Sequence, residues 1–212
     1  MSLSIILLAG GKGTRMGTPI PKVFLPLKGK PVVLHSFEIF QSFEKVTEII
    51  VVCPPNYQYL FPSDTLFALP GNTRQDSVKN GFKKTTSPHV LIHDGARPFI
   101  PQKSVETLID VGYTFGAAAL GIPMTSTVKE VNTDLTVTKT LQRSSLYTMQ
   151  TPQFLKREIL QQGLQAATSQ NLNLTDDVAL AELINHPVKI VLGSPFNIKI
   201  THLEDLHLAE SI

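Results

Sequence analysis

Cysteine is almost absent from this sequence, since Cys53 is the only one among 212 residues. A disulfide framework and a zinc site built on paired cysteines are therefore excluded. The formal net charge is only +2 at pH 7, and its even spread argues against a nucleic-acid-binding surface. No apolar run approaches membrane-spanning length, and the N-terminus lacks the charged region and cleavage site of a secretory signal. We expect a cytoplasmic protein that binds neither nucleic acid nor membrane.

Apolar, β-branched segments alternate along the chain with amphipathic segments of helix length. This rhythm predicts an α/β fold in which helices cover both faces of a mostly parallel sheet. A hydrophobic content of 42% suffices for one sizeable core, so we expect a single domain over residues 1–212. The expected strands are Ser4–Leu8, Glu48–Val52, Thr65–Leu69, Val90–His93, Phe115–Ile122, Val188–Leu192 and a short final one at Asn197–Thr201. The expected helices are Val32–Phe43, Arg74–Lys84, Lys103–Gly112, Phe154–Ala167, Asp176–Ile184 and Leu203–Ser211.

Residues 124–150 depart from this alternation and predict a β-hairpin arm. Two strand-like segments, Thr127–Val131 and Thr136–Leu141, flank the polar turn Asn132–Asp134, with no helical pattern between them. An isolated hairpin is only marginally stable in water. It either folds back on its own domain or reaches a second subunit, and we favour an arm that joins a homodimer. Arg143, where the hairpin ends, either closes a neighbour's site or lies on a solvated edge.

Glycines follow the first expected strand. Gly10, Gly11 and Gly13 offer backbone N–H groups that can approach a phosphate without a Cβ in the way. Arg15 and Lys22 add positive charge nearby. The spacing matches neither a Walker A loop nor the dinucleotide-binding fingerprint. The alternative is a tight strand-to-helix turn with solvated charges, but two cations at short range favour a phosphate site.

Acidic residues occur in two informative places. Asp94 follows an apolar strand and is expected at its carboxyl end, where a carboxylate can hold a divalent cation that bridges phosphates. The alternative is an Asp-Gly turn with Arg97 as the ion partner of Asp94. The neighbouring His93 is expected to be structural rather than a general base. Thr175–Asp177 indicates a helix N-terminus, where acidic side chains complement the helix dipole in a structural role.

Two further segments carry weaker signals. Gly71 permits close backbone approach before a helix whose cap is Asn72 or Thr73. Ser77 and the backbone near Asn72 could then contact a base or sugar, although an ordinary helix start explains the same pattern. Lys199 taken alone is typical of an exposed lysine.

Five separated motifs in this sequence resemble those of one family, the 2-C-methyl-D-erythritol 4-phosphate cytidylyltransferases of the non-mevalonate isoprenoid pathway. Each motif is weakly specific, but together they follow the family's order and spacing over nearly the whole chain. The matching segments are Leu8–Met16 with Pro21-Lys22, Gly71–Val78, His93–Pro98, Thr151-Pro152-Gln153 and Asn197–Ile200.

The resemblance implies a Rossmann-like, three-layer nucleotidyltransferase fold with a mostly parallel sheet and a protruding β-arm that exchanges contacts in a homodimer. It implies cytidylyl transfer from CTP to 2-C-methyl-D-erythritol 4-phosphate, with Mg²⁺ or another divalent cation held by Asp94 and the CTP phosphates. The implied nucleotide-binding residues are Ala9, Gly10, Gly11, Lys12, Gly13, Gly71, Asn72, Ser77, Asp94 and Ala96. The implied catalytic residues are Arg15, Lys22 and Lys199, and the implied acceptor-binding residues are Thr127, Arg143, Lys199 and Asp94.

The chain departs from the family pattern at three positions. Ser126 precedes Thr127, where the family often has an acidic residue, so the family's contacts in the sugar-phosphate pocket do not carry over at this position. Pro70 and Asn72 stand where a glycine and an acidic residue are usual. Asn72 still presents a backbone N–H and an amide, which suffice to read a base.

These residues suit attack of the acceptor's phosphate oxygen on the α-phosphorus of CTP, with pyrophosphate leaving in line. Three alternatives stay open: a ribitol-5-phosphate cytidylyltransferase, a sugar-1-phosphate nucleotidyltransferase that uses another nucleotide, and a non-catalytic nucleotide-binding protein on this fold. The presence of Arg15, Lys22, Asp94 and Lys199 together disfavours the last, because a protein that only binds does not need all four.

Overall fold

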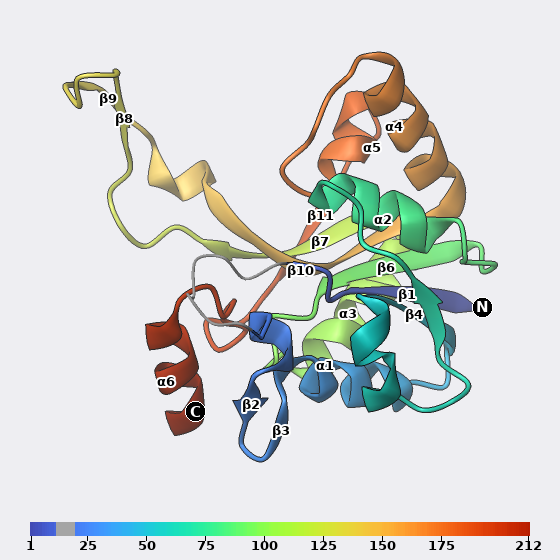
Figure 1. The fold of residues 1–212 in the computed structure, drawn as a ribbon. Coiled ribbons are helices and arrows are strands. Elements are labelled where there is room, and N and C mark those ends of the chain that lie inside the picture. Colours follow the sequence, from blue (N-terminus) through green and yellow to red (C-terminus); the bar gives the residue numbers. More distant parts are fainter. Residues whose placement is uncertain (12–19) are drawn as a thin grey trace.

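The computed structural model describes residues 1–11 and 20–212, which form an α/β fold around one seven-stranded sheet (Figure 1). The strand order is β11-β7-β10-β6-β1-β4-β5. Only β10 runs antiparallel to its neighbours β6 and β7, and the other pairs are parallel. The mostly parallel sheet predicted from the sequence is therefore confirmed. The strands are β1 (Leu3–Leu8), β4 (Val46–Val52), β5 (Leu66–Ala68), β6 (His89–Asp94), β7 (Ala117–Pro123), β10 (Tyr147–Lys156) and β11 (Lys189–Leu192).

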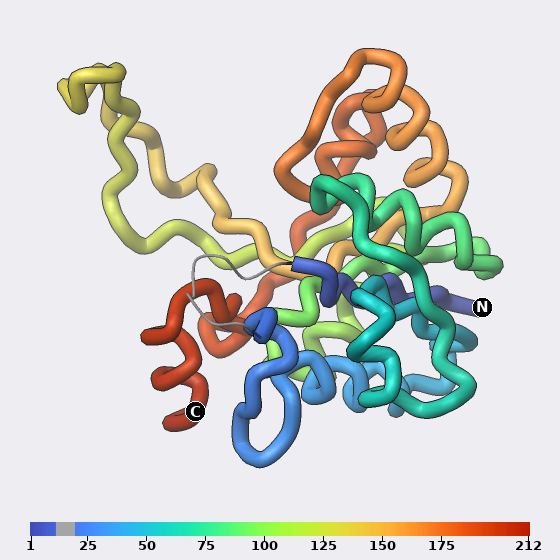
Figure 2. Tube along the Cα trace, viewed as in Figure 1, coloured from blue at the N-terminus to red at the C-terminus, as the bar shows by residue number. Residues whose placement is uncertain are grey.

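Helices cover both faces of the sheet and give three layers (Figure 2). Alternate residues of β1 explain why, because Ile5 and Leu7 pack with α1 and α3 while Ile6 and Leu8 pack with α2, α4 and α5. Ile5, Ile6 and Leu7 are fully buried, and each such side chain contributes about 1.5–3 kcal/mol of transfer free energy. The helices are α1 (Val32–Gln41), α2 (Arg74–Phe82), α3 (Gln102–Phe115), α4 (Arg157–Ser169), α5 (Ala179–Leu183) and α6 (Leu203–Ser211).

The helix expected at Phe154–Ala167 begins later than the sequence predicts. Gln153, Phe154 and Leu155 belong to β10 and pair with both β6 and β7. Phe154 packs into the core on one face of the sheet and Leu155 into the core on the other. A central strand that is apolar on both faces resembles a buried helix in sequence, and pairing with two neighbours decides in favour of the strand.

Three other expectations differ from the structure, one about a strand and two about helix boundaries. No strand forms at Asn197–Thr201, where one backbone bond, from Ile200 N–H to the Ala96 carbonyl, replaces a ladder. The helix expected from Asp176 begins only at Ala179, whose N–H is capped by the Asp176 carboxylate at 3.1 Å. At α3 the helix instead runs past its expected end to Phe115. Gly116 then adopts φ +84° and stops it, a conformation that favours glycine.

The chain between β7 and β10 contains a hairpin of β8 (Lys129–Val131) and β9 (Val137–Thr140), which forms a separate two-stranded sheet. It projects away from the body of the molecule and does not fold back on it (Figure 1). Val131, Leu135 and Val137 are large apolar side chains that are 45%, 80% and 53% exposed on it. The protruding arm is thus confirmed, and its exposed apolar surface fits contact with another chain.

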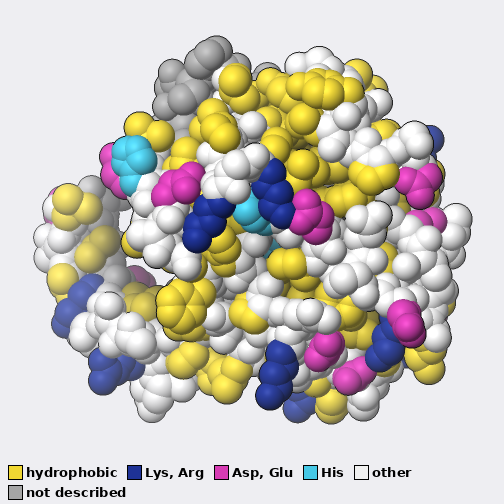
Figure 3. All heavy atoms as spheres, turned by 90° about the horizontal axis from the view of Figure 1, so that it is seen from below, with side chains coloured by type: hydrophobic (Ala, Val, Ile, Leu, Met, Phe, Trp, Pro, Cys, Tyr) yellow, Lys and Arg dark blue, Asp and Glu magenta, His cyan; other side chains and the backbone are white. Residues whose placement is uncertain are grey.

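The surface of the molecule mixes charges of both signs. Seen from below, Lys and Arg side chains lie among Asp and Glu side chains over the described part of that face (Figure 3). A small antiparallel pair, β2 (Pro26–Leu27) and β3 (Lys30–Pro31), packs near α6, where Leu27, Val32 and Ala209 share a minor core. Among the described residues, no helix has the length and apolar character needed to span a membrane.

Candidate active site

Loops that follow β1, β5 and β6 meet at one edge of the sheet. Leu8 and Asp94 are register partners at the ends of β1 and β6, and the Gly95 N–H donates to the Leu8 carbonyl at 2.9 Å. A Cβ on Gly10 would come within 2.5 Å of Pro70 Cβ, so the loop after β1 lies directly against the loop after β5. In parallel sheets this carboxyl edge is where ligands bind.

The loop after β5 is held in shape by the start of α2. Thr73 caps the helix, because its hydroxyl accepts from Asp76 N–H at 3.0 Å while the Asp76 carboxylate accepts from Thr73 N–H at 3.1 Å. The Ser77 hydroxyl accepts from Gly71 N–H and donates to the Thr73 carbonyl, both at 3.0 Å. A Cβ on Gly71 would meet Asp76 Cβ at 2.2 Å. Thr73 rather than Asn72 is therefore the cap, and nucleotide contacts by Asn72 and Ser77 stay predictions.

Asp94 is the centre of a charge cluster that joins distant parts of the chain. Lys199 Nζ lies 2.6 Å from Asp94 Oδ2, and Arg74 Nε donates to Asp94 Oδ1 at 3.1 Å. Burial by itself would raise the pKa of Asp94, but Arg74 and Lys199 hold it well below its usual range. Arg97 is not the contact ion partner of Asp94 that the alternative expected, because its Nη1 donates to the Asn197 carbonyl at 2.7 Å. Its charge still helps to lower the pKa of Asp94 after Arg74 and Lys199.

Arg74 was not among the site residues expected from the sequence, although it links two carboxylates. Its Nη1 and Nη2 donate to the two oxygens of Asp177, each at 2.7 Å. The Asp177 side chain is only 2% exposed, and burial raises its pKa. The bidentate bond to Arg74 opposes this rise and favours the ionised form of Asp177. The position of Arg74 in the first turn of α2 was a signal in the sequence. A cation there interacts unfavourably with the helix dipole, which indicates that the residue has a role other than stabilising the helix.

Replacing Arg74 by methionine is expected to destabilise the protein by about 3–5 kcal/mol, because it strands the buried Asp177 carboxylate. Urea unfolding at pH 7 measures this change. The double variant Arg74→Met/Asp177→Leu should recover most of the loss, since well-packed apolar groups replace buried ion pairs at little cost. Arg74→Lys keeps the charge but cannot form the bidentate bond, so its free energy of unfolding should lie between those of the wild type and Arg74→Met. A double variant as unstable as Arg74→Met would contradict this explanation.

Gln153, on β10, holds the loop of Asp176 and Asp177 in place through three hydrogen bonds. Its Oε1 accepts from the N–H groups of Asp177 and Val178 at 2.8 and 2.9 Å, and its Nε2 donates to the Asp176 carboxylate at 3.1 Å. Gln153 is 1% exposed, so these bonds form in a low-dielectric interior where they are strong. The Thr-Pro-Gln motif therefore positions an acidic loop that the sequence assigned only to helix capping.

His93 connects β6 to the same motif through a chain of hydrogen bonds. Its Nε2 faces the Arg97 carbonyl at 3.1 Å, and its Nδ1 faces Thr151 Oγ1 at 3.1 Å. A carbonyl only accepts, so Nε2 carries the proton and Nδ1 accepts from the Thr151 hydroxyl. Thr151 Oγ1 in turn accepts from Asp94 N–H at 3.0 Å. His93 therefore has the structural role expected from the sequence, which is to fix the backbone around Asp94.

The pKa of His93 is lowered to about 4 from 6.5, because burial disfavours the charged ring more than its bond to the Arg97 carbonyl favours it. Between these values the unfolded chain binds more protons than the folded one, so stability rises with pH. As pH falls from 6.5 to 4, His93 should therefore remove about 3 kcal/mol from the free energy of unfolding. When the free energy of unfolding from urea titrations is plotted against pH over this range, it should depend less on pH for His93→Asn than for the wild type. The exposed His207→Asn serves as control, and parallel curves for wild type and His93→Asn would refute a neutral His93.

The C-terminal segment reaches the site through a buried asparagine. Asn197 Nδ2 donates to the Thr151 carbonyl at 2.9 Å and to Gln150 Oε1 at 3.2 Å. With the bond between Ile200 and Ala96, these contacts dock the segment on the turn after β6 and place Lys199 at Asp94. Two of the predicted charged residues, Asp94 and Lys199, are thus brought together.

The remaining predicted residues divide into three groups. Lys22 begins a short 3-10 helix and lies close enough to Asp205, at the start of α6, to help lower the pKa of that carboxylate. Thr127 and Arg143 lie on the arm, where Arg143 Nη1 donates to the Thr125 carbonyl at 2.8 Å. The predictions for Lys12, Gly13 and Arg15 fall outside the described residues. Within the described ranges, 1–11 and 20–212, no cluster of three or more His, Cys, Asp or Glu side chains could hold a metal ion.

The chain is similar over its whole length to proteins of known activity. A sequence profile of the IspD family, 2-C-methyl-D-erythritol 4-phosphate cytidylyltransferase, matches residues 3–212. The protein of that name from Chlamydia pneumoniae is 44% identical over 210 residues, 99% of this chain and 98% of that protein. The chloroplastic one from Oryza sativa subsp. japonica is 41% identical over 220 residues, 100% of this chain and 74% of the rice protein.

Solved structures agree with this match. The cytidylyltransferase of the same name from Thermus thermophilus superposes with a TM-score of 0.85 at 29% identity and covers 100% of this chain and 98% of its own. The 4-diphosphocytidyl-2C-methyl-D-erythritolsynthase from Anaerococcus prevotii gives a TM-score of 0.88 at 26% identity, with 99% and 95% covered. Profile, sequence identity and fold therefore point to one assignment. The chain belongs to the 2-C-methyl-D-erythritol 4-phosphate cytidylyltransferase family.

Proposed function

We propose that this protein transfers the cytidylyl group of CTP to 2-C-methyl-D-erythritol 4-phosphate, giving CDP-methylerythritol and pyrophosphate for isoprenoid precursor synthesis. One observation carries the proposal: Asp94, Lys199 and Arg74 form a charge cluster beside the loop after β1. Family membership supports this reaction over ribitol-phosphate transfer, transfer from another nucleotide, and nucleotide binding without chemistry. Both substrates are phosphorylated and do not cross membranes unaided, so the protein must share a compartment with them, and we propose that this compartment is the cytoplasm.

The reaction requires two anions to meet. A phosphate oxygen of the acceptor attacks the α-phosphorus of CTP, the bond from that phosphorus to the bridging oxygen breaks, and pyrophosphate leaves with the electron pair. The nucleophile is already ionised near neutral pH, so no general base is needed. Two unit charges 4 Å apart repel by about 4 kcal/mol at an effective dielectric near 20, and fixed cations offset this repulsion.

Among the described residues, Lys199 is the cation best placed to offset this repulsion. Its side chain is 39% exposed while its amine is bound to the buried Asp94 carboxylate, so we propose that it contacts a phosphate without losing its anchor. In the proposal Lys22 and Arg15 supply further positive charge on the side of the triphosphate. The backbone from Gly10 to Gly13 is proposed to cradle the phosphates, whereas the Ala9 N–H already donates to the Val52 carbonyl at 2.9 Å. The loop around Gly71 is proposed to read the cytosine.

Asp94 is the residue we propose for holding a divalent cation. Magnesium binds through one or two carboxylates and otherwise through water and substrate phosphates. Both Asp94 oxygens already accept a bond, from Arg74 and from Lys199, so a cation would use a second lone pair on one of them. The low pKa of Asp94 keeps it ionised at any working pH. A bound Mg²⁺ would supply charge neutralisation for the triphosphate and the leaving pyrophosphate.

The acceptor is tested by incubating the protein with CTP, Mg²⁺ and either methylerythritol phosphate or ribitol 5-phosphate. We expect pyrophosphate release with the first and at least about 10²-fold lower kcat/KM with the second, because unpaired polar groups in a site penalise the wrong substrate strongly. Equal rates would make the acceptor assignment wrong but leave cytidylyl transfer in place. Binding of CTP without release from either acceptor would favour the non-catalytic alternative.

We also propose that the arm works in a homodimer and that Thr127 and Arg143 bind the acceptor in the partner subunit's site. The support is the projection of the hairpin away from its own body and the apolar side chains exposed on it (Figure 1). A closed two-fold dimer with exchanged arms would cover both hairpins at once.

A further inference from the structure

A groove separates α2 from α4 on the face of the sheet that these helices cover. Its volume is about 400 Å³, within the range of small-molecule sites. Phe82 and Leu164, only 9% and 5% exposed, supply its apolar lining. The other lining residues are Lys79 and Lys83 from the α2 side and Gln161, Gln165, Thr168 and Ser169 from α4.

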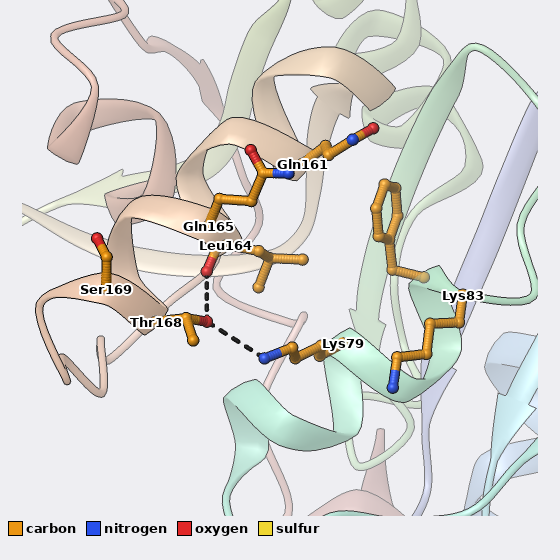
Figure 4. A pocket seen from close by; sticks show the side chains of 8 residues that line it. Lys79, Lys83, Gln161, Leu164, Gln165, Thr168 and Ser169 are labelled. Carbon is orange, nitrogen blue, oxygen red and sulfur yellow. Dashed lines mark hydrogen bonds between the residues drawn. The ribbon is translucent and has the colours of Figure 1, made fainter.

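The charges around this groove have one sign. None of its lining side chains is acidic, whereas two lysines of the α2 side, Lys79 and Lys83, belong to the lining. Lys79 extends across the groove toward Thr168, and Lys83 extends beside α2 (Figure 4). Lys79 Nζ donates to Thr168 Oγ1 at 3.2 Å across the groove, and an anion would offer that amine a stronger, charge-assisted bond. Glu158 is the nearby carboxylate on α4, but it is exposed in the first turn and does not line the groove.

We propose that the groove between α2 and α4 binds a small amphiphilic anion, a short hydrocarbon chain that carries a phosphate or diphosphate. The chain would lie on Phe82 and Leu164, and the head group would bind Lys79 and Lys83. Charge complementarity selects an anion, and the apolar lining selects a chain over a bare phosphate. The groove holds only about 400 Å³, which suits the short chain of a free metabolite better than the long tails of a membrane lipid.

The groove is connected to the proposed active site through α2. Arg74, which pairs with Asp94 and Asp177, opens this helix, and Lys79 follows little more than one turn later. Gln75 ties α2 to the loop after α4, donating to the Leu172 carbonyl at 3.0 Å and accepting from Leu174 N–H at 2.9 Å. A ligand that clamps the two helices therefore acts on the element that carries Arg74. We therefore expect ligand binding in the groove to change the affinity for CTP. This expectation rests on the proposed function, whereas binding in the groove does not.

Binding is tested with n-octyl phosphate, kept below its micelle concentration, on uniformly ¹⁵N-labelled protein. We expect saturable amide shifts confined to α2, α4 and their ends. Lys83→Gln should weaken binding about tenfold, because hydrogen bonds to charged groups are among the strongest. Lys84→Gln is the matched control: Lys84 is the next residue and is also exposed but lies outside the groove, so it should bind as the wild type does. Octanol and inorganic phosphate, which each carry half of the ligand, should bind at least about tenfold more weakly.

Shifts scattered over the surface, or equal losses in Lys83→Gln and Lys84→Gln, would overturn the site. Octanol as tight as octyl phosphate would overturn its preference for anions, and binding only to vesicles containing phosphatidic acid would overturn a soluble ligand. The link to the active site predicts a change in CTP affinity of about fivefold when octyl phosphate saturates the groove. An unchanged CTP affinity with intact groove binding overturns that link, whereas failure to bind CTP without octyl phosphate counts against the proposed function instead.

Discussion

Lys199→Ala is expected to lower kcat by about 10²–10³, the loss typical of removing one preorganised group that stabilises charge in the transition state. In the structure Lys199 Nζ lies 2.6 Å from the Asp94 carboxylate, at the edge of the sheet where the two anionic substrates are proposed to meet. Its charge matters most when the five-coordinate phosphorus gathers negative charge. We therefore expect kcat and kcat/KM to fall together, with a smaller change in KM.

Three comparisons separate this role from a structural one. Lys84→Ala removes an exposed lysine that does not belong to the charge cluster and should leave turnover unchanged. Lys199→Arg keeps the charge but not the compact ammonium, so partial activity is expected. Urea unfolding of Lys199→Ala should show a small change in stability, because Arg74 still neutralises Asp94. Near-wild-type turnover in Lys199→Ala would remove the catalytic role assigned to it.

Much of this fold follows from local pattern. The apolar segments that became β1, β4, β6 and β11 are short, β-branched and bounded by turn residues, so periodicity alone predicts them. The hairpin is also predictable, since two alternating segments flank a polar turn. The start of α4 is not, because Phe154 and Leu155 are apolar neighbours whose separation onto two faces of the sheet depends on β6 and β7. Non-local pairing of this kind leaves no local signal.

The site shows the same division between local and long-range information. The positions of Asp94, Gly71 and Lys199 were predictable from motifs and from the family resemblance, because each lies in a short segment of distinctive composition. Arg74 and Asp177 are 103 positions apart and were each explained locally, as a helix start and a helix cap. Only the folded chain shows that they form one buried pair. The convergence of Arg15, Lys22 and Lys199 around one pocket stays a prediction. Lys199 lies at Asp94, Lys22 lies near Asp205, and Arg15 falls outside the described residues.

Mixing two inactive variants is expected to restore activity if the arm serves the partner's site. Arg143→Ala removes a cation from the arm, and Lys199→Ala removes one from the body of the same chain. In a mixed dimer, one site combines an intact Lys199 with an intact Arg143 from its partner, while the other site lacks both. Random pairing at equal amounts makes half the dimers mixed, with one good site in two, so about one quarter of wild-type activity should return.

The measurement is pyrophosphate release by each variant alone and by the mixture after subunits have exchanged. Both variants alone should retain about a hundredth of wild-type turnover or less, so a return to a quarter is a large signal. Two variants of the body, Lys199→Ala and Asp94→Ala, are the matched control, because a mixed dimer of these still has a defect in every site. No recovery with Arg143→Ala, in a sample whose solution mass is that of a dimer, would show that the arm serves its own subunit. A monomeric mass for the wild type would remove the exchange itself, and with it the reason proposed here for an apolar hairpin that extends into solvent.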